Sequence, residues 1–158
     1  MLVENKQAVE VVYKNLVDVG NDIVNEASAT IDKMVKKLKR EYTTMSNSEL
    51  CKFITELSVE LYFFGQQKDR ATLEQMCADA VYKNGLAREF VFNEGSVLDR
   101  QTIAAINNND KLTVKLLYDL VSNSLKTKLD EAHRLINVIN NIVISRNAEA
   151  KLAAGYGN

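Results

Sequence analysis

The longest hydrophobic pattern in the chain lies between residues 111 and 154. Leucine, isoleucine, valine and alanine recur there at steps of three and four residues, with no proline and no glycine before Gly155. This spacing places the apolar side chains on one face of a single amphipathic helix. At about 1.5 Å per residue the helix would be about 65 Å long. A helix of that length needs a long helical partner, from its own chain or from a second copy.

We expect this helix to mediate self-association, because its apolar stripe is too long for a compact globule of this size. The protein is therefore predicted to be a homo-oligomer. The residues assigned to the oligomer interface are Leu117, Val121, Leu125, Leu135, Ile139 and Ile142.

A second helical pattern covers residues 4–42. Its apolar positions keep steps of three and four residues and include Ile23 and Ala27. Gly20 interrupts the pattern at a cost of about 1 kcal/mol relative to alanine. A bend or a frayed turn at Gly20 is compatible with the pattern.

The third pattern, residues 47–92, begins at a clear helix start signal. Ser46 and Glu49 have the spacing of a capping box, in which each side chain bonds the backbone N–H of the other residue. We expect one long helical arm from this point, with Gly65 and Gly85 as positions for a kink.

A short helix is expected between the arm and the long C-terminal helix. Ser96 with Asp99 resembles an N-cap followed by an acidic residue in the first turn. The polar run Asn107–Asp110 should end this helix, because Asn and Asp favour caps and turns. The sequence thus predicts one all-α domain over residues 1–158, elongated and built as an antiparallel hairpin or bundle. Its expected helices cover residues 4–42, 47–92, 96–106 and 111–154.

Composition supports long helices and narrows the functional classes. The 158 residues contain no proline, where average usage would give about eight, and proline breaks helices. The formal net charge is −1, so bulk charge would not hold the chain on nucleic acid. Any such contact would need a local basic patch, or weak patches gathered by oligomerisation.

Residues that carry catalytic or metal chemistry are sparse. His133 is the single histidine, and no phosphate-binding loop or nucleophile motif is present. We therefore predict a protein that is not an enzyme, with no cofactor, metal or small-molecule substrate. Cys51 and Cys77 are interpreted as small buried side chains in a reducing compartment. No signal peptide or membrane span is seen, which predicts a cytoplasmic protein, in the host cytoplasm if phage-encoded.

A concentrated basic stretch is the strongest candidate for binding. Five bases in eight residues can complement the dipole at the end of a helix, or they can bind phosphates. The bases are Lys33, Lys36, Lys37, Lys39 and Arg40. The aromatic run Tyr62-Phe63-Phe64 likewise leaves two interpretations open, which are packing or a subunit interface, and base stacking.

The order of these elements resembles the small helical recombination mediators of tailed phages, the UvsY-like proteins. The similarity is carried by residues 96–155, where a short helix, a polar break and an apolar rod follow one another. The segment from Glu56 to Gly65, with aromatic residues before a glycine, is also similar.

The resemblance implies a viral homo-oligomer with coiled-coil character that binds single-stranded DNA in recombination or replication. Its partners would be a recombinase, which it loads, and a single-strand-binding protein. Lys68 and Arg70 would add to the basic stretch in DNA binding. The alternative is a helical protein–protein interaction module without nucleic-acid binding. Examples are a virion or scaffold component and a small inhibitor of a host enzyme.

Overall fold

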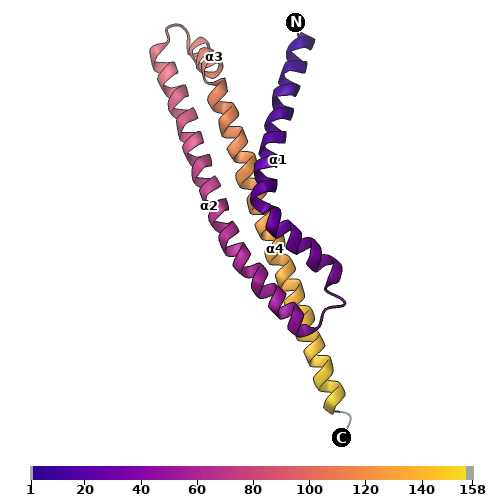
Figure 1. The fold of residues 1–158 in the computed structure, drawn as a ribbon. Coiled ribbons are helices and arrows are strands. Elements are labelled where there is room, and N and C mark those ends of the chain that lie inside the picture. The colour runs from indigo at the N-terminus through magenta and orange to yellow at the C-terminus, as the bar shows by residue number, and fades with distance from the viewer. Residues whose placement is uncertain (1, 156–158) are drawn as a thin grey trace. The chain divides into compact units, whose positions relative to one another are not determined.

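The computed structural model describes the backbone of residues 2–155 and the side chains of residues 11–154. This part of the chain forms α-helices and no strands, so the all-α prediction is confirmed (Figure 1). The helices are α1 (Leu2–Glu41), α2 (Asn47–Phe92), α3 (Val97–Asn107) and α4 (Asn109–Gly155).

The chain divides into two compact units, each built from parts of several helices. Unit 1 comprises Met1–Glu26 and Gln67–Leu125, and unit 2 comprises Ala27–Gln66 and Lys126–Asn158. Unit 1 has nine Lys and Arg against thirteen Asp and Glu, whereas unit 2 has eleven against eight. The near-neutral chain is therefore composed of an acidic unit and a basic unit.

Unit 2 is built around large apolar side chains. Its α2 segment presents residues at steps of three and four to the interior, as expected for an amphipathic helix. The α1 and α4 segments of this unit cover that face with further branched side chains. The buried apolar residues of unit 2 are Ile31, Leu38, Leu50, Phe53, Ile54, Leu57, Leu61, Phe64, Ala132, Ile136, Ile139 and Val143.

The connection between α1 and α2, also in unit 2, is held by polar contacts. The Arg146 guanidinium of α4 donates to the carbonyl of Met45 at 2.8 Å and to that of Tyr42 at 3.3 Å. Ser46 then starts α2. Its backbone N–H donates to Glu49 Oε2 at 2.8 Å, and its Oγ accepts from the Glu49 N–H at 3.3 Å. The predicted capping box is confirmed.

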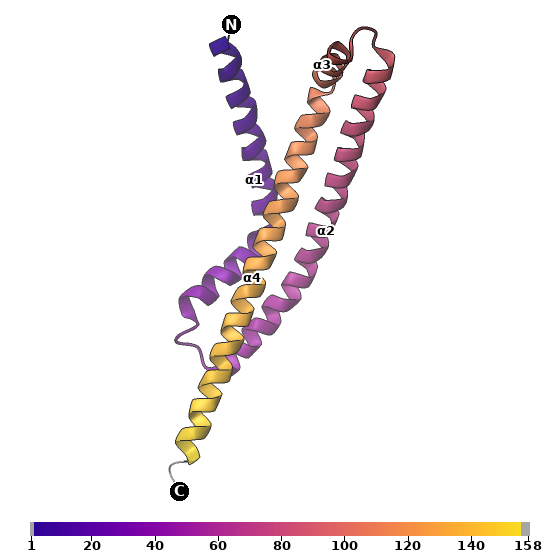
Figure 2. The ribbon, with the colours of Figure 1, turned by 180° about the vertical axis from the view of Figure 1, so that it is seen from behind.

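In unit 1, α2 and α4 run antiparallel and are joined through α3 (Figure 1 and Figure 2). Polar side chains pair between the two helices. Thr72 Oγ1 lies 3.2 Å from Ser122 Oγ, and Gln75 Nε2 donates to Asp119 Oδ1 at 2.7 Å. The buried apolar residues of this unit are small or medium-sized: Val24, Ala71, Ala78, Ala104, Val121 and Leu125.

The joint between α3 and α4 is a single buried residue. Asn108 is fully buried, donates from Nδ2 to the Ala104 carbonyl at 2.8 Å, and accepts from Lys111 Nζ at 2.6 Å. The α4 helix therefore starts at Asn109 rather than at residue 111. Ser96 caps α3 in a capping box with Asp99.

The long helix finds apolar partners within its own chain. Of the residues assigned to an oligomer interface, Val121, Leu125 and Ile139 are buried. The others, Leu117, Leu135 and Ile142, are half-buried. Val121, Leu125 and Ile139 are thus covered within the folded chain, whereas Leu117, Leu135 and Ile142 keep some exposed surface, and self-association through this helix stays a prediction.

The buried face of α1 differs in detail from the one that the sequence predicts. The helix continues through Gly20, which packs closely against the Leu120 and Leu117 side chains of unit 1. Val24 and Ser28 are buried, whereas Ile23 is 41% exposed and Ala27 is half-buried. The buried residues Val24 and Ser28 each lie one position beyond the expected Ile23 and Ala27.

Candidate nucleic-acid interface

Basic side chains of unit 2 surround a shallow hollow on α1. The hollow has a volume of about 350 Å³ and is lined by Lys33, Lys36, Lys37, Arg40 and Glu41. Residues at steps of three and four share one face of a helix, which explains why these side chains converge. We call this feature the basic hollow.

The structure separates one predicted base from the other four. Lys39 is exposed but does not line the basic hollow. The four bases that do line it are all exposed as well. The α1 helix thus gathers most, but not all, of the predicted phosphate-binding residues on one side.

Two carboxylates near the basic hollow are already paired. Glu41 accepts from Arg40 at 2.6 Å, and Asp32 accepts from Lys128 of α4 at 2.6 Å. Lys33 and Lys36 form no salt bridge with any residue that the structure describes. Their positive charge therefore remains available to an external anion.

The pKa of Asp32 favours its salt bridge with Lys128 near the basic hollow. Partial burial raises the pKa of Asp32, but hydrogen bonds from Lys128 and Ser28 and the charges of Lys128 and Lys36 outweigh that effect. The net pKa lies below its usual value of 3.8. Asp32 is therefore ionised at neutral pH, and Lys128 offsets its charge beside the hollow.

Lys37 has a partner that the sequence pattern did not indicate. Its ammonium lies 5.6 Å from the centre of the Phe53 ring on α2. Because an ammonium over an aromatic face is attracted to the ring, this contact orients the Lys37 side chain at the rim of the basic hollow. Only the folded structure brings these two positions together.

Unit 2 also exposes a pair of aromatic rings. Tyr62 and Phe63 are 67% and 55% exposed, and their rings meet edge-on with centroids 5.6 Å apart. Phe64, the next residue, is buried in the core of unit 2. The aromatic run thus divides into one packing residue and two rings with accessible faces.

The remaining predicted bases, Lys68 and Arg70, lie in unit 1. Lys68 pairs with Asp69 at 2.9 Å, and Arg70 pairs with Glu74 at 3.2 Å. Paired side chains present less net charge to a phosphate. The structure provides no basis for grouping these two residues with the basic hollow.

Other chemistry is sparse in the part of the chain that the structure describes. Within it, no group of His, Cys, Asp and Glu side chains could hold a metal ion. Among residues 2–155, no helix has the length and apolar character needed to cross a membrane. Cys51 and Cys77 are free and exposed, so the expectation that both are buried is wrong. They lie on the solvent side of α2, where helical spacing alone did not place them.

No protein-family model, curated protein or solved structure matches the chain. The functional assignment therefore rests on the residues described above.

Proposed function

We propose that unit 2 binds single-stranded nucleic acid through the basic hollow. The observation that carries this proposal is the convergence of four exposed bases, of which Arg40 pairs with Glu41 and the other three form no salt bridge within the described residues. Phosphate contacts from Lys and Arg supply most of the affinity in binding that does not depend on sequence. Unit 2 also has more bases than acids, so its wider charge favours the same ligand.

Stabilisation of the α1 helix end accounts for only part of the basic stretch. The favourable effect of cations on the helix dipole falls off within the last turn. Lys39 and Arg40 occupy that turn, but Lys33 and Lys36 lie further back in α1. Stabilisation of the helix end therefore does not explain Lys33 and Lys36, whereas phosphate binding gives these two exposed bases a role.

The exposed aromatic pair favours single strands over duplex. Unpaired bases can stack on aromatic side chains, which is worth about 1–3 kcal/mol per base. Tyr62 and Phe63 offer such faces within the same unit as the basic hollow. In a duplex the bases are stacked on one another and are not available for this contact.

The biological role that we propose is assistance to recombination or replication, by loading a recombinase onto single strands covered by single-strand-binding protein. The resemblance to phage mediators motivates this role, which needs no catalytic group of the chain's own. Its direct test is the stimulation of strand exchange by a recombinase on coated single strands. Single-strand binding without stimulation would confine the function to binding.

Salt dependence is the first test of phosphate contact. Anisotropy of a labelled oligothymidylate should report binding that weakens as salt is added. With about three phosphate contacts, affinity should fall about 20-fold between 50 and 200 mM salt, at a slope of about −0.7 per contact. Absence of binding at the lower salt concentration would refute the proposal.

A charge-matched pair of variants locates the contact. The hollow variant replaces Lys33, Lys36 and Arg40 with Glu. The control replaces Lys39, Lys126 and Lys151 with Glu; these bases are exposed in unit 2 and lie outside the basic hollow. The hollow variant should lose at least about 10-fold more affinity than the control. Equal losses would mean that bulk charge, and no defined site, attracts the nucleic acid.

A third variant tests the aromatic contribution. Replacing Tyr62 and Phe63 with Ala should reduce single-strand affinity about 10-fold and leave duplex affinity unchanged. If both affinities change equally, the rings have no stacking role.

A further inference from the structure

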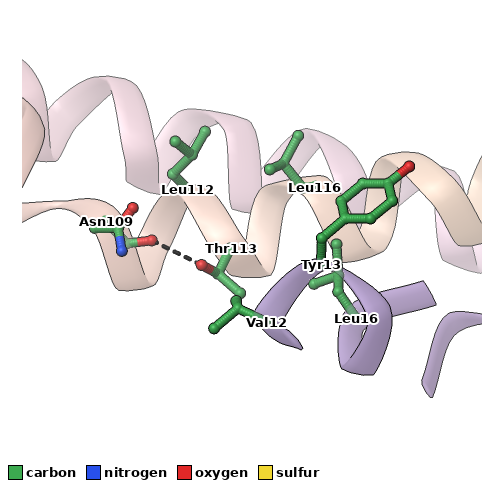
Figure 3. Close-up of a pocket in the computed structure, with 7 residues that line it drawn as sticks. All are labelled: Val12, Tyr13, Leu16, Asn109, Leu112, Thr113 and Leu116. Carbon is green, nitrogen blue, oxygen red and sulfur yellow. Dashed lines mark hydrogen bonds between the residues drawn. The ribbon is translucent and has the colours of Figure 1, made fainter. Parts of the chain in front are cut away.

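Unit 1 contains an apolar groove between α1 and α4, separate from the basic hollow. Its volume is about 310 Å³, and its lining is formed by Val12, Tyr13, Leu16, Asn109, Leu112, Thr113 and Leu116. Figure 3 shows the Tyr13 ring beside Leu116, and Val12 beneath Thr113. Thr113 Oγ1 bonds the Asn109 carbonyl at 2.9 Å, so the polar groups at this end are partly satisfied. We call this feature the apolar groove.

Large side chains on both walls of the apolar groove remain open to solvent. Val12 is 55% exposed, Tyr13 is 65% exposed and Leu116 is 44% exposed. The exposed stripe continues along α1 through Val19 and Ile23. Val12, Leu16, Val19 and Ile23 follow steps of four, three and four, which is the spacing of a coiled-coil seam.

The size of this surface is sufficient for a small dimer interface. Summed over Val12, Tyr13, Leu116, Val19 and Ile23, the exposed area is roughly 500 Å². A two-fold contact that covers this area on both copies would bury about 1,000 Å² in total, which is the lower limit for a specific interface.

We propose that the apolar groove is the face by which two copies of this chain associate. The α1 and α4 segments of unit 1 would pair with the same segments of a second copy around a two-fold axis. A two-fold interface uses the same patch on both partners, so each copy supplies the apolar area that the other leaves uncovered. The pairing would form a four-helix contact with the exposed seam of α1 at its centre.

The uncharged lining of the apolar groove favours a second copy of the chain over nucleic acid or a charged small molecule. None of the seven lining residues carries a charge, so nucleic acid and charged small molecules find no partner there. The proposed dimer is independent of nucleic-acid binding by unit 2. It also uses other residues than the interface assigned to the long helix, three of which are buried within the chain.

Light scattering during size-exclusion chromatography tests the proposal. At about 50 µM the wild-type protein should have twice the 17.8 kDa mass of one chain. The variant with Val12→Glu and Leu116→Glu should have the mass of one chain, because a dimer would bury two unpaired carboxylates per copy. Its helicity by circular dichroism should equal that of the wild type. Tyr13→Glu alone serves as a second, milder disruption of the groove.

The matched control carries the same charges on the α2 surface of unit 1. Leu73→Glu with Met76→Glu changes two residues that are 62% and 63% exposed and do not line the groove. This control should remain dimeric. A monomeric wild type, a larger assembly than a dimer, or equal dissociation of the groove variant and the control would each overturn the proposal. The hollow variant should also remain dimeric, so the two proposals can fail separately.

Discussion

The two units bury different kinds of side chain. Unit 2 encloses leucine, isoleucine and phenylalanine, among them Leu57 and Phe64. Unit 1 encloses alanines such as Ala71 and Ala78, together with the polar Asn108 and Ser122. Because burial of apolar area contributes roughly 25 cal/mol per Å², unit 2 should hold most of the folding free energy.

On the surface the order is reversed, because unit 1 exposes more of its large apolar side chains than it buries. Unit 1 leaves large apolar side chains in solvent, including Leu73, Met76 and Phe92 as well as those of the apolar groove. Its helices also pair through hydrogen bonds between polar side chains, which contribute only about 1 kcal/mol each. Unit 2 therefore carries most of the large buried side chains and a basic surface, whereas unit 1 exposes the apolar surface that the proposed dimer would cover.

The largest expected difference comes from truncating a leucine in each unit. Leu57 of unit 2 is completely buried, whereas Leu73 of unit 1 is 62% exposed. Leu57→Ala should lower the free energy of unfolding by about 2–5 kcal/mol, since it leaves a cavity. Leu73→Ala should change it by less than about 0.5 kcal/mol. Urea unfolding followed by circular dichroism measures both, and similar losses would contradict the assigned difference in packing.

A pair of glycines in α2 tests the close packing of unit 1. A Cβ atom at Gly85 would overlap the buried Asn108 amide, whereas one at Gly65 of unit 2 would meet nothing within 4 Å. Gly85→Ala should therefore destabilise the protein by about 1–3 kcal/mol. Gly65→Ala should stabilise it by about 0.5–1 kcal/mol through helix propensity. A neutral Gly85→Ala would show that α2 and α3–α4 are not in close contact there.

Acid titration should reveal a smaller effect at the Asp32–Lys128 pair of unit 2. The folded-state pKa of Asp32 is lowered, so its contribution to stability is present above the unfolded pKa of about 3.9. That contribution is lost as the pH falls through the folded pKa. Asp32→Asn should remove part of the decrease in stability below about pH 4 and cost less than about 1 kcal/mol at neutral pH. An unchanged pH profile would argue against the pair.

Local sequence signals predicted where α2 and α3 start. The capping pairs Ser46–Glu49 and Ser96–Asp99 each span three residues, so both partners are visible in a short stretch of sequence. Helical periodicity likewise predicted that α2 continues through Gly65 and Gly85.

Periodicity did not predict which surface covers each apolar face. The contact between Thr72 and Ser122 joins residues that are 50 positions apart, and no local pattern specifies it. Three of the residues assigned to an oligomer interface, Val121, Leu125 and Ile139, are covered within the chain for the same reason. Their spacing indicates burial, and only the folded chain shows that α2 supplies a partner.

For the candidate site, as for the fold, the sequence predicted the local features and not the contacts between distant residues. The four bases of the basic hollow lie close together in the sequence on one helix, so their spacing was sufficient to group them. The contacts of Lys37 with Phe53 and of Asp32 with Lys128 join distant positions. The apolar groove was missed because its two walls, residues 12–16 and 109–116, are about 100 positions apart in the sequence.

Hydrogen exchange along α2 tests the central contrast between the units most directly. The helix contributes residues 47–66 to unit 2 and residues 67–92 to unit 1, so one element reports on both. In dilute wild-type protein, amides in the interior of the 47–66 segment should exchange at least about 10-fold more slowly than those of the 67–92 segment, since the latter buries fewer apolar contacts. Equal protection of the two segments, or slower exchange in residues 67–92, would contradict the conclusion that unit 2 holds most of the stability.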